Sequence, residues 1–171
     1  MNGDFMFFIN LFFLNSFLGF IMETSLKYLL YPNMHNGILF GPWVPLYGFG
    51  ALFIYALYSL IEKKLSWKKI WKVFLLFVSV VVFLSLLEWL GGTLIEFLFH
   101  KEFWDYGDQK FHLGPYISLG MSLLWGFLSL VFVFIVLPLE KKLIKKIPRF
   151  FTIGVSILFP VDCVVTYFLI S

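Results

Sequence analysis

The sequence predicts an all-α fold, a polytopic bundle of about five transmembrane helices that forms a single membrane domain. Hydrophobic residues make up 61% of the 171 residues and charged residues only 13%, with a mean hydropathy of +0.92. This composition is too apolar for a soluble globular domain. Apolar stretches of roughly twenty residues, long enough to cross a bilayer, recur along the whole chain. The lipid bilayer is therefore its expected surroundings, and the cell membrane its expected location.

Short polar or proline-containing breaks separate the spans. The N-terminal apolar run has no basic segment before it and no small-residue cleavage site, which indicates a retained first span rather than a signal peptide. The second span follows HNGILFGPWVPLYGFG, whose two prolines and four glycines favour an irregular or re-entrant stretch over a regular helix. The expected spans are residues 5–28, 42–61, 71–98, 115–138 and 150–170.

The basic residues predict the orientation of the chain. Ten of the thirteen lysines and arginines lie in two short loops, at 63–72 and 141–149. The positive-inside rule places both loops in the cytoplasm, with the N-terminus inside and the C-terminus outside. The net charge of +3 is accounted for by this topology, so a nucleic-acid partner is not expected.

An internal repeat is also predicted. A shift of 78 residues places LYGF at 46–49 on LWGF at 124–127, and IEKKL at 61–65 on LEKKL at 139–143. Each expected unit begins and ends on the same side of the membrane, so the repeat is parallel. We expect one repeat at about 5–65, a second at about 71–143, and an extra helix at about 150–170.

Carboxylates inside apolar spans are the first candidates for function, because an ionisable group in lipid is costly without a partner or water. Glu88, Gly92 and Glu96 follow one another at intervals of four and share a helix face. At about 1.5 Å per residue, Glu88 lies about 24 Å from Lys72, in the outer leaflet. Glu23 reaches a similar depth, and the repeat would bring these carboxylates to one outward-facing mouth. A structural interpretation, in which they accept hydrogen bonds from neighbouring helices, stays open, and for Asp162 it is preferred.

The loop after the third span concentrates aromatic, acidic and small residues. Trp104, Asp105 and Tyr106 face the expected mouth, although an interfacial turn capped by Asp105 explains the same pattern. The histidines lack the local spacing of a zinc site, and the serines lack the context of a nucleophile, so neither a metal nor a catalytic set is expected. The predicted binding residues are Glu23, Asn36, Trp43, Tyr47, Glu88, Glu96, Trp104, Asp105, Tyr106, Ser118, Ser122 and Trp125.

Three motifs carry a resemblance to a known family: NGILFGPWVPLYGFG, the Glu88 stretch leading to WDY, and the segment FHLGPYISLGMSLLWG. Over residues 15–145 the chain resembles the CmpB-like family of type IV ABC-transporter permeases, which are small multi-pass membrane proteins. Two positions depart from the family pattern. The family commonly has an arginine between Asn36 and Gly37, and an asparagine at the position of His112. The shared signature positions are Asn36, Gly37, Gly41, Pro42, Pro45, Tyr47, Gly48, Glu88, Trp104, Asp105, Tyr106, Gly114, Leu119, Ser122, Trp125 and Gly126.

The resemblance implies a permease, and the chain has no GxxxxGK[ST] loop for nucleotide. ATP chemistry would need a separate ATPase or membrane subunit, and five spans enclose a pathway only as a homodimer or with a larger partner. No cofactor is expected. The favoured hypothesis is a transporter component whose outward-facing acidic and aromatic site binds a cationic or polar solute. The alternatives are a membrane-embedded enzyme acting on a lipid or envelope precursor, and a non-catalytic scaffold that binds other helices along its glycines.

Overall fold

The computed structural model describes residues 3–30, 39–100, 102 and 104–170, and it confirms the all-α fold class. Within these residues, five helical stretches are long and apolar enough to cross a membrane. They are Gly3–Ser25, Pro45–Lys64, Lys69–Phe99, Leu119–Ile144 and Arg149–Leu169. The predicted number of spans and their approximate positions are therefore confirmed, and the protein is a multi-pass membrane protein.

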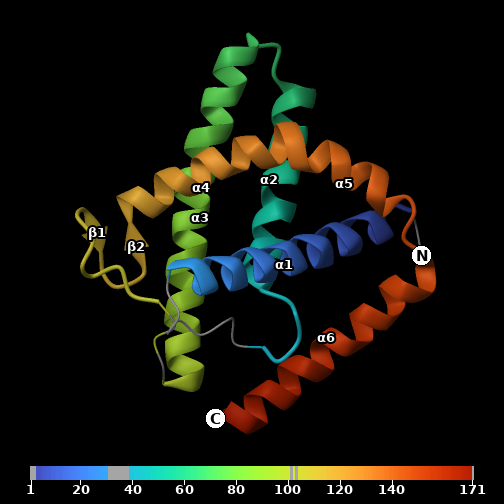
Figure 1. The fold of residues 1–171 in the computed structure, drawn as a ribbon. Helices are drawn as coiled ribbons and strands as arrows, with labels where there is room; N and C mark the ends of the chain where they lie inside the picture. The colour runs from blue at the N-terminus through green and yellow to red at the C-terminus, as the bar shows by residue number, and fades with distance from the viewer. Residues whose placement is uncertain (1–2, 31–38, 101, 103, 171) are drawn as a thin grey trace. The chain divides into compact units, whose positions relative to one another are not determined.

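Figure 1 shows the elements in chain order. Two short strands form an antiparallel hairpin, in which His112 pairs with Ser118 and Leu113 with Ile117. The elements are α1 (Gly3–Leu30), α2 (Pro45–Lys64), α3 (Lys69–Phe99), β1 (His112–Leu113), β2 (Ile117–Ser118), α4 (Leu119–Val131), η1 (Phe132–Val136), α5 (Leu137–Ile144) and α6 (Arg149–Ile170).

The boundaries differ from the expected ones where glycine and proline shape the chain. The second helix begins at Pro45, and residues 39–44 are not helical, which agrees with the irregular stretch predicted there. Proline suits the first helical turn because its missing N–H has no partner there anyway. The fourth span begins at Leu119 rather than 115, because a strand occupies Ile117–Ser118. A single π-helical turn, η1, lies just before Pro138, where the proline lacks the N–H of a regular helix.

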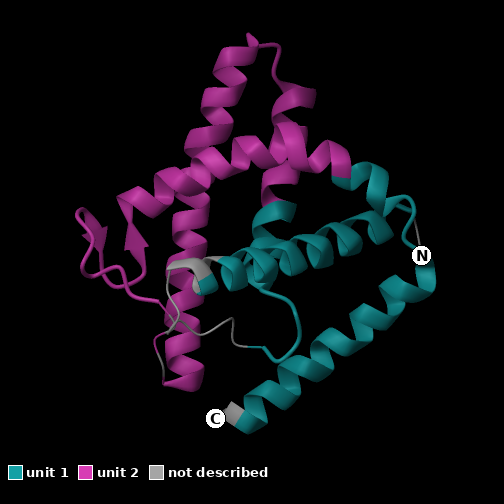
Figure 2. Ribbon diagram, viewed as in Figure 1, with its two compact units in different colours: residues 1–52, 140–171 teal, residues 53–139 magenta. Residues whose placement is uncertain are grey.

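The chain forms two compact units, coloured separately in Figure 2. Unit 1 consists of residues 1–52 and 140–171, and unit 2 of residues 53–139. Helices α2 and α5 each contribute to both units. These units do not follow the boundaries of the expected repeat, which stays a prediction.

The core of unit 2 is apolar and joins three helical elements. Leu76, Val80 and Leu84 of α3 pack with Ile54 of α2 and Val133 of η1. Small residues allow α4 to approach α3, as is common between helices in membranes. A Cβ atom on Gly126 would lie 2.6 Å from Cγ2 of Val81 and 2.7 Å from Cε2 of Phe77. The close approach of α3 and α4 therefore depends on the missing side chain of Gly126.

Unit 1 is held by polar as well as apolar contacts. Asn10 of α1 accepts a 2.7 Å hydrogen bond from the hydroxyl of Thr152 in α6, and both side chains are buried. Asn15 of α1 donates 3.2 Å to Oε2 of Glu140 in α5. The ring of Phe159 contacts Phe12 with a centroid distance of 5.7 Å. Polar side chains at these positions hold α1 to α5 and α6 in surroundings where water does not compete for them.

Candidate functional site

The candidate site in unit 2 is built on one face of α3. The buried residues of this helix are Leu76, Val80, Leu84, Glu88 and Gly92, one for every four positions. Since residues four apart lie on the same side of a helix, the stripe that forms the core continues directly into Glu88 and Gly92. Glu88 is 4% exposed, whereas Glu96, one turn beyond Gly92, is exposed. The face thus changes from apolar to acidic toward the C-terminal end of α3.

The loop before α4 folds back onto this face. The backbone N–H of Tyr106 donates 2.7 Å to the carbonyl of Pro115, which ties the WDY segment to the β1–β2 hairpin. The hairpin turns at Gly114, whose φ of +64° is a left-handed conformation that glycine adopts without a steric penalty. Asp105 is exposed, and its Oδ1 accepts 2.7 Å from the N–H of Gly107. The structure therefore places Asp105 as the cap of its own turn, as in the alternative interpretation of the sequence.

Tyr106 connects this loop to the buried carboxyl group of Glu88. Its hydroxyl donates 3.2 Å to Oε1 of Glu88. The indole of Trp125 on α4 interacts with the same carboxyl group, at a geometry outside that of a regular hydrogen bond. Among the described residues, no regular hydrogen bond reaches Oε2 of Glu88 and no basic side chain pairs with the carboxyl group. Tyr106 and the Trp125 indole are thus the neighbours of this buried acidic side chain, and neither carries a charge that would compensate it.

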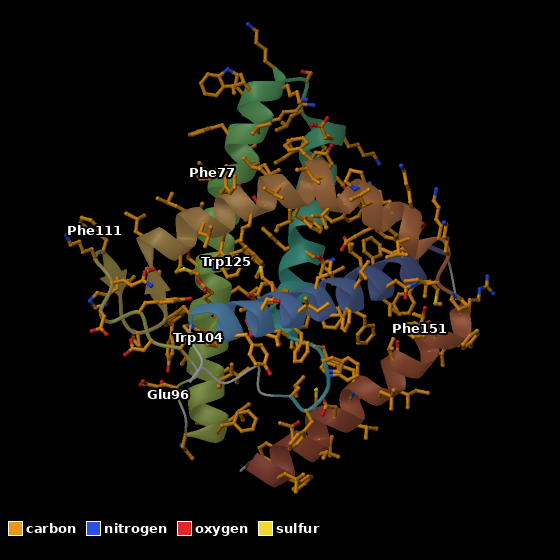
Figure 3. All side chains as sticks on the ribbon, in the orientation of Figure 1. Phe77, Glu96, Trp104, Phe111, Trp125 and Phe151 are labelled. Carbon is orange, nitrogen blue, oxygen red and sulfur yellow. The ribbon has the colours of Figure 1, made fainter. Side chains whose placement is uncertain are left out.

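Tyr116 makes the corresponding contact with Glu96. Its hydroxyl donates 2.8 Å to Oε2 of Glu96, and its ring lies on Gly92, where a Cβ would be 2.5 Å from the ring carbons. Trp104 packs edge-on against Tyr116 with ring centroids 5.8 Å apart. In the described part of the chain, the buried Nε1 of Trp104 has no hydrogen-bond partner. Figure 3 labels Glu96, Trp104 and Trp125, which all belong to unit 2.

The two serines of the predicted site have structural partners. Ser118 is the N-cap of α4 and accepts 3.2 Å from the N–H of Met121, which satisfies one of the free donors at the helix start. Ser118 also donates 2.7 Å to Oε1 of Gln109. The hydroxyl of Ser122 lies 2.6 Å from that of Ser85 on α3. Both serines thereby hold α4 and its preceding loop in place beside the acidic face.

The environment of Tyr116 yields a prediction about its titration. Burial, followed by the hydrogen bond and the negative charge of Glu96, raises the pKa of Tyr116 to about 12. A free tyrosine titrates near 10, so the unfolded chain loses this proton first. The contribution of Tyr116 to stability is therefore complete below about pH 10 and is lost as the pH rises toward 12. We expect the phenolate absorbance of the wild-type protein minus that of Tyr116→Phe to show a titration near pH 12, and a titration near pH 10 would contradict this.

The remaining predicted site residues belong to unit 1. The ring of Tyr47 packs on Gly19 of α1, and its hydroxyl interacts with Glu23, four residues further along α1. Trp43 donates 2.6 Å from Nε1 to Oδ2 of Asp162 in α6. Asn36, and likewise His35, Gly37 and Lys101, lie outside the described residues. Glu23, Trp43 and Tyr47 thus form contacts of their own within unit 1.

A tyrosine ring over a glycine recurs in the two units. In unit 1, Tyr47 covers Gly19 and bonds Glu23, and in unit 2 Tyr116 covers Gly92 and bonds Glu96. In each case the glutamate follows the glycine by four residues, so the two lie on one helix face. Tyr116 was not among the predicted residues, although the GPY motif at 114–116 that contains it matches GPW at 41–43. The polar contacts of Asn10 and Asn15 were not predicted either, although both residues stand out as amides within an apolar span.

Neither a metal centre nor a cofactor site stands out in the part of the chain that the structure describes. No three side chains of histidine, cysteine, aspartate or glutamate gather there in a way that could hold a metal ion. Glu88 instead faces a hydroxyl and an indole group, and Glu96 faces a hydroxyl group. Such a set of acceptors and aromatic rings suits a cationic or hydrogen-bonding solute.

The fold and this acidic face define a multi-pass helical membrane protein with carboxyl groups inside its spans. A family profile described as "Putative ABC-transporter type IV" matches residues 10–167, and the chain belongs to this family. The predicted resemblance is thereby confirmed over almost the whole chain. Comparison with curated proteins and with solved structures found no match.

Proposed function

We propose that this protein is the membrane-embedded component of a transporter and that Glu88 binds a cationic or polar solute. The observation that carries the proposal is the buried carboxyl group of Glu88, whose Oε2 has no regular hydrogen bond from the described residues. A buried acidic group in a membrane span is costly unless a partner compensates it. A bound cation or donor would supply that compensation.

The surroundings of Glu88 support a solute rather than a purely structural role. Tyr106, which belongs to the loop before α4, donates to one carboxyl oxygen of Glu88. The indole of Trp125 in α4 interacts with the same carboxyl group. Aromatic rings next to a carboxylate attract ammonium groups through their negative faces. Membership in an ABC-transporter family supports transport as the activity. Because the sequence has no nucleotide-binding loop, we propose that a separate ATPase chain provides the energy.

The experiment compares solute-dependent stabilisation of the wild-type protein and Glu88→Gln in lipid nanodiscs. Choline and putrescine are the probes, and sodium chloride at equal ionic strength is the reference. A ligand at one hundred times its Kd stabilises by about 2.7 kcal/mol, so we expect a clear rise in the Tm of the wild type. Glu88→Gln keeps the shape of the side chain and removes the charge, so it should fold with normal yield and lose the shift.

Glu62→Gln is the matched control, because it removes the same charge from an exposed residue whose recorded partner is Lys72 at 3.2 Å. It should respond to the probes as the wild type does. The proposal is wrong if Glu88→Gln keeps the full shift. It is also wrong if Glu88→Gln fails to fold while Glu62→Gln folds, since the carboxyl group would then be structural.

A further inference from the structure

Asp162 in unit 1 is an acidic residue inside a span, held by neutral donors only. Its Oδ2 accepts 2.6 Å from Nε1 of Trp43 and 3.0 Å from the N–H of Gly41. Its Oδ1 accepts 3.2 Å from the N–H of Phe40 and 3.4 Å from the hydroxyl of Thr166. These donors satisfy the lone pairs of a carboxylate but do not neutralise a negative charge. No basic side chain whose placement the structure describes pairs with Asp162.

A groove of about 480 Å³ opens beside this carboxylate. Its walls on α6 are the side chains of Leu158, Val161, Val165 and Leu169, which lie on one face of the helix. Trp43 also lines the groove, and its ring packs edge-on against Phe159 with centroids 5.9 Å apart. The groove is wide and open rather than enclosed, and it combines apolar walls with one carboxylate.

We propose that this groove binds a hydrophobic amine, with its ammonium group at Asp162 and its hydrocarbon part along the apolar face of α6. The charge decides the class of ligand. A fatty acid would place a second negative charge beside Asp162, and an alcohol would leave the carboxylate without a counter-charge. A metal ion would find a single carboxylate in an otherwise apolar groove, far fewer oxygen ligands than calcium or magnesium requires. This site lies wholly within unit 1 and does not depend on the Glu88 site.

Hydrogen bonds from the loop at 40–43 preorganise the carboxylate of Asp162 for a ligand. Phe40, Gly41 and Trp43 all donate to Asp162, so the carboxylate is fixed in one orientation before any ligand arrives. A fixed charge loses little conformational entropy on binding, which favours affinity. The ring of Trp43 also offers an aromatic surface near the position of the ammonium group.

The test uses octylamine as the probe, with octanol and octanoate as controls of equal chain length, and measures the Tm of the protein in nanodiscs. We expect octylamine to raise the Tm of the wild type and both controls to leave it unchanged. Val165→Trp fills the groove while keeping Asp162 and the residues that donate to it, and it should weaken octylamine binding at least tenfold. Val164→Trp is the matched control, because Val164 is exposed and does not line the groove. It should bind as the wild type does.

Two further variants complete the test. Asp162→Asn should lose the preference for octylamine over octanol, and Glu88→Gln should retain full octylamine binding, which separates this inference from the proposed function. An equal response of the wild type to octylamine and octanol would overturn the proposal. So would unchanged binding by Val165→Trp, or a native mass showing a dimer that Val165→Trp abolishes, since a second copy would then occupy the groove.

Discussion

Replacing Asn15 with leucine is expected to lower the free energy of unfolding by about 2–3 kcal/mol, because it removes the one hydrogen bond recorded for a buried carboxyl group. Asn15 donates 3.2 Å to Oε2 of Glu140, which is 4% exposed. Within the described residues, Oε1 of Glu140 has no partner at all. The leucine variant would leave both carboxyl oxygens of Glu140 buried in apolar surroundings without a donor. Unfolding in mixed micelles of a mild and a denaturing detergent measures the change.

Glu140→Gln provides the contrast to Asn15→Leu. It replaces the carboxylate by a neutral amide, and a neutral group without a partner is less costly to bury than a charge. The free energy of unfolding should therefore fall by less than about 1 kcal/mol. In the double variant, Asn15→Leu should cost much less than it does alone, since the two residues are in contact. Equal costs of Asn15→Leu with Glu140 and with Gln at this position would show that the charge of Glu140 adds nothing to the hydrogen bond, since the amide oxygen of glutamine also accepts from Asn15.

Replacing Gly92 with alanine is expected to destabilise the protein by about 1–3 kcal/mol, the usual cost of overpacking a close contact. The new Cβ would lie 2.5 Å from the ring of Tyr116 and would push it away from α3. That displacement also breaks the 2.8 Å hydrogen bond from Tyr116 to Glu96. The same unfolding measurement applies. The titration of Tyr116 should in addition move down from about 12 toward its ordinary value, because burial and the Glu96 contact are lost together.

Gly120→Ala is the matched control for Gly92→Ala. At Gly120 of α4, a Cβ would meet only Oε1 of Gln109 at 3.8 Å, an ordinary van der Waals distance. Alanine favours helix by about 1 kcal/mol over glycine, so this variant should be neutral or stabilising. If Gly92→Ala were as stable as Gly120→Ala, the close approach of Tyr116 would be absent in solution.

Hydropathy alone was sufficient to predict the spans. The third span is the clearest case, since 71–98 was expected and Lys69–Phe99 is observed, with lysines and a histidine at its ends. The start of the fourth span was placed four residues too early. Residues 115–118 are apolar enough to resemble a span, but Pro115 cannot donate a helical hydrogen bond, and Ile117–Ser118 pairs instead with His112–Leu113.

The sequence predicted the carboxylates of the candidate site, but only some of the residues that hydrogen-bond to them. Glu88 and Glu96 stood out because charge is rare in lipid, and their shared face followed from their spacing. The partners were not predictable in the same way. Asp105 is adjacent to Tyr106 in sequence, yet Asp105 caps a turn while Tyr106 reaches Glu88, because loop conformation decides which side chain points toward α3. The orientation of the termini and the repeat remain predictions.

The sequence by itself determined that this is an all-α membrane protein, because transfer of apolar residues into lipid depends on composition and length rather than on neighbours. It also indicated that Glu23, Glu88, Glu96 and Asp162 need a partner, but it did not single out Glu140. Only the tertiary structure decided what the partners are: Tyr106 for Glu88, Tyr116 for Glu96, Asn15 for Glu140, and the loop donors at 40–43 for Asp162. The last two pairs join residues more than one hundred positions apart. Hydrogen bonds act over about 3 Å, so they depend on the packing that brings the two side chains together.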